Sequence, residues 1–584
     1  MFFVSSLFFT KLRALVVEGT RRMQTLDETS NLLPPPEEAE APPLEQKFHE
    51  YNLALPKFPI LFSLWLGSFL SSLDSTIVAN IMNRVAEEFS ESSKKQWIAT
   101  SFLLTNTAFQ PLYGKLSDIT GRKSALLTAQ FFFGLGCLLT CFARNVTEFS
   151  IARAICGIGA GGLNAISSIA VSDICTARER GVYQGYANIV FGFGQLLGAP
   201  LGGVFIETIG WRALFGIQVP VIMLCSVLAI KNINIKLFHV PPMKERYTLK
   251  NLSRIDIFGS LSLVATISGV LFLCSSQLNK LYLALFTIGS FTVFILVERY
   301  YATEKILPFE LLTRSFCLSS AVTVISSFVV FGEIFRSPIY LQLLQNISVT
   351  KTGLFLIFPS ISVAVGSLVT GWVLRNTKIN LAHCAYQIIF GGMIMQLLGL
   401  GLGYLLLSHL NPDYTIYDML ESITFRSNSI WWKLIYVFAS VLVSFGYACL
   451  LVATLVSIVF TVEKSQQGTM TGVFYLWRSI GNVLGASLTL VSYENSLSSM
   501  LWNYMFKTKR DDEYHFTKKQ YYSLINDSSY LRGPNFPTDI FVRILDVYKK
   551  AFLISYIPNI ALAAVGIVLS LYLVKHTYKR SSSS

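Results

Sequence analysis

The stretch that decides the fold is Gly114-Lys-Leu-Ser-Asp-Ile-Thr-Gly-Arg-Lys-Ser-Ala-Leu126, a short polar and basic segment between two long apolar runs. Gly114 allows two helices to approach closely, and Gly121 can adopt the left-handed conformation that ends a helix. Asp118 lies four residues before Arg122, a spacing at which the two side chains can pair. An acid and a guanidinium at a helix end can form a latch that one conformation makes and another breaks. The stretch therefore predicts a cytoplasmic turn between two membrane helices.

The composition is that of a polytopic membrane protein. The chain has 584 residues, of which 52% are hydrophobic and only 14% are charged, too few for a soluble protein of several domains. A nucleic-acid binder would concentrate the net charge of +13 in a polar domain, whereas Lys and Arg here punctuate apolar runs. The nine cysteines lie in or at the ends of apolar segments without metal-ligand spacing. We therefore expect packed thiols, and neither a disulfide framework nor a metal site.

Apolar runs of roughly twenty residues, each long enough to cross a hydrocarbon core of about 30 Å, follow one another along the chain. They predict an all-α membrane protein with about fourteen transmembrane helices. The expected spans are 58–82, 97–116, 124–142, 149–171, 182–206, 213–230, 255–276, 281–297, 316–339, 353–374, 384–407, 432–460, 468–491 and 551–574.

The distribution of basic residues assigns a direction to these spans. With both termini in the cytosol, the inner loops hold most Lys and Arg residues, as the positive-inside bias requires. Arg122 and Lys123 lie in one such inner loop, and the positive-inside bias alone would explain either cation. Three glycosylation sequons then fall on the outer side, at Asn145, Asn346 and Asn526.

Polar tails flank the spans. Residues 1–57 become acidic and proline-rich, which predicts a disordered cytosolic tail, and residues 1–22 are expected to precede the native start. Residues 575–584 form a short cytosolic tail at the other end. The first tail contains an acidic dileucine string of the kind that cytosolic sorting adaptors bind, although such short strings also arise by chance. Its residues are Glu28, Leu32 and Leu33.

The first span contains a single carboxylate, Asp74, within an otherwise apolar run. An ionisable residue at mid-helix costs about 2.5 to 3.5 kcal/mol on insertion scales, so it is a candidate functional residue. Burial favours the protonated form of a carboxyl group, which would let Asp74 exchange protons. The alternative is that Asp74 only hydrogen-bonds a neighbouring helix.

Other polar residues within the spans are further candidates. Arg153 is a cation in a span whose glycines permit tight packing. Glu333 and Arg336 lie three residues apart on one helix face, so they either neutralise each other or leave Glu333 free to face the pathway. Asn482 is a further polar candidate for substrate or proton binding, and Arg478, one turn before it, is a candidate for conformational change.

The fifth span contains glycines four residues apart, which give one helix face a smooth surface for packing. A proline within the run frees a backbone carbonyl and bends the helix, which makes it a candidate hinge. The residues of this glycine motif are Gly194, Gly198, Pro200, Gly202 and Gly203.

These motifs resemble the major facilitator superfamily. The segment 114–123 matches the signature G-x-L-x-D-x-x-G-R-[RK] at every fixed position. The string Leu-Asp-Ser-Thr-Ile-Val around Asp74 resembles the first-span signature of the fourteen-span drug:proton antiporter branch. The glycine motif resembles G-x-x-x-G-P-x-x-G-G, except that its proline follows Ala199 and not Gly198. With the acidic tail, these features are similar to those of the fungal vacuolar basic amino acid transporters.

The resemblance implies two six-helix halves, residues 58–230 and 301–574, that rock about a central site. Residues 231–300 would contribute a cytosolic loop and two inserted helices, and residues 493–550 a lumenal loop. The resemblance also implies that Arg153 takes part in proton coupling.

For function, the resemblance implies that lysine, histidine and arginine enter the acidic vacuole in exchange for lumenal protons. A carboxylate that either binds a proton or pairs with a cationic substrate would give exchange by competition, with Asp74 and Glu333 as candidates. A drug or toxin:proton antiporter shares every motif named above. A transport-dead nutrient receptor would keep the fold and signal through its tails.

Enzyme activity has no support in the sequence. We find no phosphate-binding loop, no metal-spaced His and Cys set and no nucleophile elbow. The energy for transport must then come from an ion gradient. We expect no cofactor, no metal and no nucleic-acid partner. The expected partners are amino acids, protons, membrane lipid and a sorting adaptor, and the protein is expected to be a monomer.

Overall fold

The computed structural model describes residues 43–89, 91, 96–238, 240–241, 246, 248, 256–275, 279–302, 313–345, 347, 349–377, 380–409, 430–460, 467–507, 516–526, 530 and 536–581. The chain divides into two units, residues 1–51 and residues 52–584. The described residues of the first unit belong to helix α2 (Pro43–Leu53), which ends two residues into the second. Four candidate residues lie outside the described residues: Glu28, Leu32, Leu33 and Asn346.

Long helices make up most of the described part of the second unit, and each overlaps one of the expected spans. They are α3 (Lys57–Glu88), α4 (Gln96–Thr120), α5 (Arg122–Cys141), α6 (Val146–Ile174), α7 (Ala177–Thr208), α8 (Gly210–Asn232), α10 (Ile257–Ser275), α11 (Lys280–Tyr300), α12 (Arg314–Ile339), α13 (Val349–Asn376), α14 (Leu381–His409), α15 (Ile430–Phe460), α16 (Gln467–Trp502) and α18 (Thr538–Ser581).

Ten candidate membrane spans among the described residues are long and apolar enough to cross a membrane. Helices α4, α7, α10 and α16 are not among these ten. Helices α4, α7 and α16 carry polar side chains that meet between the two halves of the protein, as described below. This polarity lowers their mean hydropathy.

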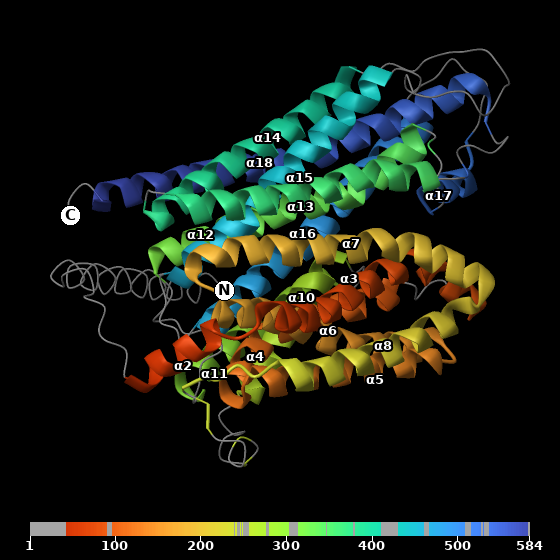
Figure 1. The fold of residues 1–584 in the computed structure, drawn as a ribbon. Coiled ribbons are helices and arrows are strands. Elements are labelled where there is room, and N and C mark those ends of the chain that lie inside the picture. Colours follow the sequence, from red (N-terminus) through yellow and green to blue (C-terminus); the bar gives the residue numbers. More distant parts are fainter. Residues whose placement is uncertain are drawn as a thin grey trace, which may run out of the picture. The chain divides into compact units, whose positions relative to one another are not determined.

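Two groups of six helices repeat one packing arrangement (Figure 1). In the N-terminal half, α3 packs against α6, α7 and α8, and α5 packs against α6 and α8. In the C-terminal half, α12 packs against α15, α16 and α18, and α14 packs against α15 and α18. The halves therefore correspond helix by helix, with α3 matched to α12, α6 to α15 and α7 to α16. Such a repeat is typical of secondary transporters.

The two halves meet through matched pairs of helices. Helix α7 of the N-terminal half packs against α13 of the C-terminal half, and α4 packs against α16. Because α4 corresponds to α13 and α7 to α16, these two contacts are equivalent. Helix α10 touches both α4 and α16 and packs against α11. The two helices between the halves in sequence therefore lie beside the junction of the halves in space.

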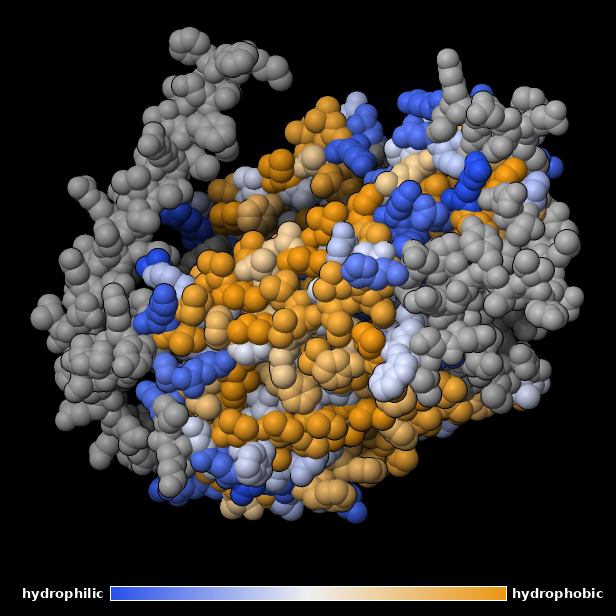
Figure 2. All heavy atoms as spheres, turned by 90° about the horizontal axis from the view of Figure 1, so that it is seen from above, coloured by the Kyte–Doolittle hydropathy of each residue, from blue (hydrophilic) through white to orange (hydrophobic). Residues whose placement is uncertain are grey.

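Apolar side chains cover much of the exterior as well as the core. On α11, for example, Tyr282, Leu285 and Ile288 are exposed. Figure 2 shows hydrophobic residues across the middle of the visible face and hydrophilic residues gathered toward its ends. An apolar exterior of this extent fits a hydrocarbon environment and not water. The chain is a multi-pass membrane protein.

The segment 493–550, expected to form a lumenal loop between the last two spans, is largely helical among its described residues. Helix α16 continues to Trp502 and ends in a π-helical turn (Asn503–Lys507). Helix α17 (Lys518–Asn526) follows, and α18 already begins at Thr538. The reason is visible in α16, where the buried side chains Tyr493, Leu497 and Leu501 recur every four residues and continue its apolar face.

Candidate functional site

A buried ion pair joins α3 and α6 inside the N-terminal half. Arg153 Nη1 donates to Asp74 Oδ2 at 2.8 Å, and both side chains are 0% exposed. Gln218 on α8 donates to the other carboxylate oxygen of Asp74 at 3.4 Å. The Arg153 guanidinium also lies 4.3 Å from the ring centre of Phe102. Two candidates from the sequence, an acid and a base on different spans, are thus in direct contact.

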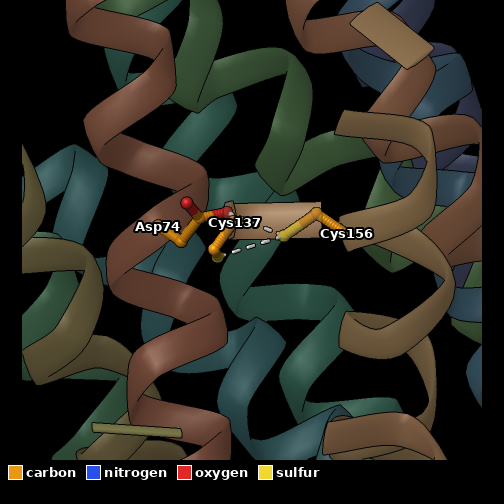
Figure 3. A group of neighbouring side chains, drawn as sticks. All are labelled: Asp74, Cys137 and Cys156. Carbon is orange, nitrogen blue, oxygen red and sulfur yellow. Dashed lines mark hydrogen bonds between the residues drawn. The ribbon is translucent and has the colours of Figure 1, made fainter. Parts of the chain in front are cut away.

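Two thiols lie beside this carboxylate, as Figure 3 shows. Cys137 on α5 and Cys156 on α6 have their sulfur atoms 3.7 Å apart, and Cys156 Sγ lies 3.9 Å from Asp74 Oδ2. The three side chains are buried with their ligand atoms within 4.8 Å of one another. Two thiols and a carboxylate suit a soft metal ion by donor type. We assign no metal here, because Arg153 already binds the carboxylate and its charge would repel a cation.

The Asp74 site is closed to solute in this conformation. Because the carboxylate is fully buried and paired with Arg153, it cannot also bind a cationic substrate directly. Two nitrogens of Arg153, Nε and Nη2, are buried without a hydrogen-bond partner. Protonation of Asp74 would remove the charge that holds the guanidinium, so a proton could change how α3 and α6 pack.

The turn between α4 and α5 holds a second cluster of charges. Gly121 has φ 89° and ψ 156°, so its φ is positive as predicted, although its ψ is extended and not that of a left-handed helix. Arg122 donates to Asp118 at 2.6 Å and to Asp173 at 2.7 Å, and its side chain is 1% exposed. The predicted pairing of Asp118 with Arg122 is confirmed. The sequence analysis missed Asp173, which lies near the end of α6 and far from the motif in sequence.

This cluster reaches the C-terminal half through Asp118. Its second oxygen accepts a hydrogen bond from the Thr469 hydroxyl at 3.0 Å, near the start of α16. The N-terminus of a helix favours a negative charge. A Cβ atom at Gly472 would lie 3.4 Å from the Cα atom of Gly114, so the helices cross closely here, as predicted for Gly114. Lys123 instead binds the Ile230 carbonyl within the N-terminal half.

Hydrogen bonds between the halves continue along α7 and α16 from this end. They join Arg180 to Thr471 (3.5 Å), Gln184 to Tyr475 (3.4 Å), Asn188 to Ser367 (2.9 Å) and Ser479 to Gln110 (2.9 Å). On each helix the donors or acceptors recur every four residues, so one face is involved. Arg180 precedes the expected span 182–206, whereas its side chain is buried between the halves.

The C-terminal half contains its own pair of an acid and a buried arginine. Glu333 and Arg336 on α12 form an ion pair, so Glu333 is not free and the neutralising interpretation is the correct one. Arg336 also donates to the Ser555 carbonyl at 3.3 Å and lies over the ring of Tyr556 on α18. Because α12 corresponds to α3, the first helix of each half contributes to an acid–arginine pair, although the second pair lies within one helix and its acid, Glu333, is 12% exposed.

Arg478 and Asn482 lie one turn apart on α16. Arg478 Nε donates to the Tyr447 hydroxyl at 3.0 Å, and its guanidinium lies 5.7 Å from the ring centre of Tyr475. The side-chain oxygen of Asn482 is buried without a hydrogen-bond partner.

The glycine motif of α7 packs against α3. A Cβ atom at Gly198 would collide with the Thr76 side chain and lie 2.6 Å from the Leu73 carbonyl oxygen, and one at Gly194 would lie 2.7 Å from the Phe69 carbonyl oxygen. At Gly202 the nearest atom would be at an ordinary 3.5 Å.

Helix α7 continues through Pro200 and Gly203 to Thr208, so the proline does not end the helix. Of the sequon residues, Asn145 caps α6 by accepting from the Glu148 backbone N–H. Asn526 is the last residue of α17.

Comparisons with known proteins agree with this arrangement. Residues 64–486 match the Major Facilitator Superfamily. The chain is 31% identical to the multidrug resistance protein fnx1 of Schizosaccharomyces pombe, over 91% of this chain and 95% of the relative. It is 33% identical to the vacuolar membrane amino acid uptake transporter fnx2 of the same organism, over 74% and 71%. It is 31% identical to the vacuolar basic amino acid transporter 2 of Saccharomyces cerevisiae, over 70% and 84%.

Two solved structures share the fold. The human organic anion transporter MFSD10 and the proton:xylose symporter XylE both give a TM-score of 0.50 at 14% identity. The matches cover 86% and 88% of this chain, and 99% and 95% of those chains. At this identity they establish architecture only. With the family match over most of the chain and the two-fold repeat of six helices, they indicate a transporter and not an enzyme: the chain belongs to the major facilitator superfamily.

Proposed function

We propose that this protein exchanges basic amino acids for protons at the vacuolar membrane, moving lysine, histidine and arginine into the vacuole as lumenal protons leave. The observation that carries the proposal is the buried pair of Asp74 and Arg153. Relatives of about 31–33% identity support the substrate class, since two of them are named for vacuolar amino acid transport.

In this proposal the proton acts on Asp74 and the substrate binds elsewhere. Neutralising Asp74 leaves Arg153 as a buried charge without its counter-ion, and breaking such a pair costs about 3–5 kcal/mol. The helices that carry the two residues must then rearrange, because Arg153 has no second acid among its described contacts. The sequence suggested that proton and substrate compete directly for Asp74. We propose instead that they compete indirectly, because protonation of Asp74 changes the helix packing on which substrate binding depends.

The Arg122 cluster would serve as the cytosolic latch. We propose that both termini are cytosolic and that fourteen helices cross the membrane, which places the contact of Asp118 with Thr469 on the cytosolic side. This conformation is then closed to the cytosol. Opening toward the cytosol would break that contact and the hydrogen bonds along α7 and α16.

A drug:proton antiporter is the second candidate. An apolar cavity of about 140 Å³ lies where α4, α10, α11 and α16 meet, and its lining includes Thr107, Ile267, Phe291 and Trp477. Pockets for drug-sized ligands usually measure about 300–1,000 Å³, so this cavity would take only a small apolar part of a drug molecule. The relative named as a multidrug resistance protein aligns with 91% of this chain.

The test is uptake by purified protein in proteoliposomes with an acidic interior. We expect labelled lysine, histidine and arginine to accumulate, and accumulation to disappear when the pH gradient is collapsed. A cationic drug should accumulate much less. Drug accumulation without amino acid accumulation would instead establish the second candidate, and no movement of either would exclude both.

A further inference from the structure

We propose that Arg478 and Asn482 bind the amino acid end of the substrate, with the guanidinium on its carboxylate and the amide oxygen on its α-ammonium group. The inference rests on the proposed function and adds a binding site to it. It concerns the part of the molecule that lysine, histidine and arginine share, and so it accounts for a transporter that accepts all three.

The first argument is position. Arg478 lies on the face of α16 that meets the N-terminal half, since Tyr475 accepts from Gln184 and Ser479 donates to Gln110 across the interface. Alternating access requires the substrate to bind between the two halves. Arg478 is itself only partly buried.

The second argument is charge. The arginines inside the two bundles each have a carboxylate, Asp74 for Arg153 and Glu333 for Arg336. Among the described residues, Arg478 forms no ion pair, and its guanidinium has a hydrogen bond to Tyr447 and lies near the rings of Tyr447 and Tyr475. A cation at membrane depth without a counter-ion is costly. An anion that arrives and leaves with each transport cycle would compensate it.

The third argument is the geometry of the donors. Tyr447 accepts from Nε of Arg478 and fixes the guanidinium, while the structure shows no hydrogen-bond partner for its Nη1 and Nη2 atoms within the described part of the chain. Two free nitrogens at the end of a fixed guanidinium suit a carboxylate, which accepts two parallel hydrogen bonds.

Asn482 supplies the complementary group. Its side-chain oxygen is a buried acceptor without a partner, and such atoms usually mark a missing ligand or water. Residues four apart on a helix have Cβ atoms about 5–6 Å apart. This spacing places an acceptor beside the guanidinium, which matches the ammonium beside the carboxylate of an amino acid.

The first experiment needs only the wild-type protein. Proteoliposomes with an acidic interior are supplied with lysine, lysinamide or cadaverine, which differ at the carboxylate. Loss of a hydrogen-bonded charge should lower uptake of both analogues roughly 10- to 100-fold relative to lysine. Equal uptake of lysine and cadaverine would overturn the inference while leaving basic solute exchange intact.

The second experiment uses Arg478→Gln, Arg478→Lys and the control Arg144→Gln, which removes a guanidinium from an exposed position outside the site. Arg478→Gln should raise KM for lysine roughly 10- to 100-fold and abolish the preference for lysine over lysinamide. Arg478→Lys should keep part of that preference, because an ammonium is a point charge without the planar fork. An unchanged preference in Arg478→Gln would contradict the inference.

The two failures are distinguishable. Wild-type protein that moves no basic amino acid refutes the proposed function. The carboxylate site still stands if the wild type carries another carboxylate-bearing solute and Arg478→Gln does not. Wild-type protein that carries no carboxylate-bearing solute refutes both. Size-exclusion profiles report whether each variant folds. If Arg478→Gln does not fold, the uptake of lysine, lysinamide and cadaverine by the wild type still tests the carboxylate site.

Discussion

Replacing Asp74 by Asn should destabilise the protein as well as stop exchange. From the sequence alone we would expect Asp74→Asn to abolish transport and leave protein abundance unchanged. The structure changes this expectation, because the carboxylate is the counter-ion of a fully buried arginine. The substitution would leave the Arg153 charge inside the bundle with only neutral groups around it.

The magnitude follows from that geometry. Removing one partner of a buried ion pair costs about 3–5 kcal/mol. The lower end is the better estimate, since the Asn side-chain oxygen can still accept from Arg153. A loss of about 3 kcal/mol changes a folding equilibrium roughly 100-fold, which is a large part of the stability of an ordinary domain.

The assay compares Asp74→Asn with the double variant Asp74→Asn/Arg153→Gln. The double variant carries neither charge, and replacing both members of a buried pair is often neutral. It should therefore regain much of the lost stability without regaining exchange. Stability is read as the fraction of fluorescently tagged protein that stays monodisperse after heating, and exchange as proton-driven lysine uptake.

The control is Asp546→Asn, which breaks an ion pair with Lys550 whose side chains are 43% and 60% exposed. Exposed pairs contribute about 0–1 kcal/mol, so this variant should match the wild type in both assays. The reasoning fails if Asp74→Asn is as stable as the wild type, or if the double variant is less stable than the single one. Either result would mean that Arg153 does not depend on Asp74.

Three further predictions follow from the packing of the halves and from the tail. Asp118→Asn removes the negative charge from the contact between Asp118 and the start of α16. A cysteine pair placed across that interface should then cross-link several-fold less, and lysine uptake should fall. Unchanged cross-linking would exclude the latch. Gly198→Ala introduces a methyl group into the α3 backbone and should lower thermal stability, whereas Gly192→Ala, which meets open space, should not; equal effects would contradict the packing. Replacing Leu32 and Leu33 by Ala should divert the protein from the vacuole by microscopy, and unchanged localisation would dismiss the signal.

The sequence predicted the helices well because membrane insertion depends on the length and polarity of each run, which are local properties. Every long helix of the described part overlaps an expected span. The assignment to the superfamily is confirmed by the match over residues 64–486. The pairing of Asp118 with Arg122 was also predictable, since four residues on a helix bring two side chains together.

Errors arose where a conclusion depended on neighbours distant in sequence. The helices within the segment 493–550 were not predicted, and the buried residues at its start continue the apolar face of α16. Arg180 lies before the expected span 182–206, and its burial depends on the approach of the C-terminal half.

What the sequence by itself determined is that this chain crosses the membrane many times, belongs to a known transporter superfamily and keeps several charges at membrane depth. Only the tertiary structure decided which charges neutralise one another: Asp74 with Arg153, Glu333 with Arg336, and none for Arg478 within the described residues. The physical reason is that hydropathy fixes where a helix lies along the membrane normal. Its rotation and neighbours, which choose the partner of each charge, are fixed by packing between helices.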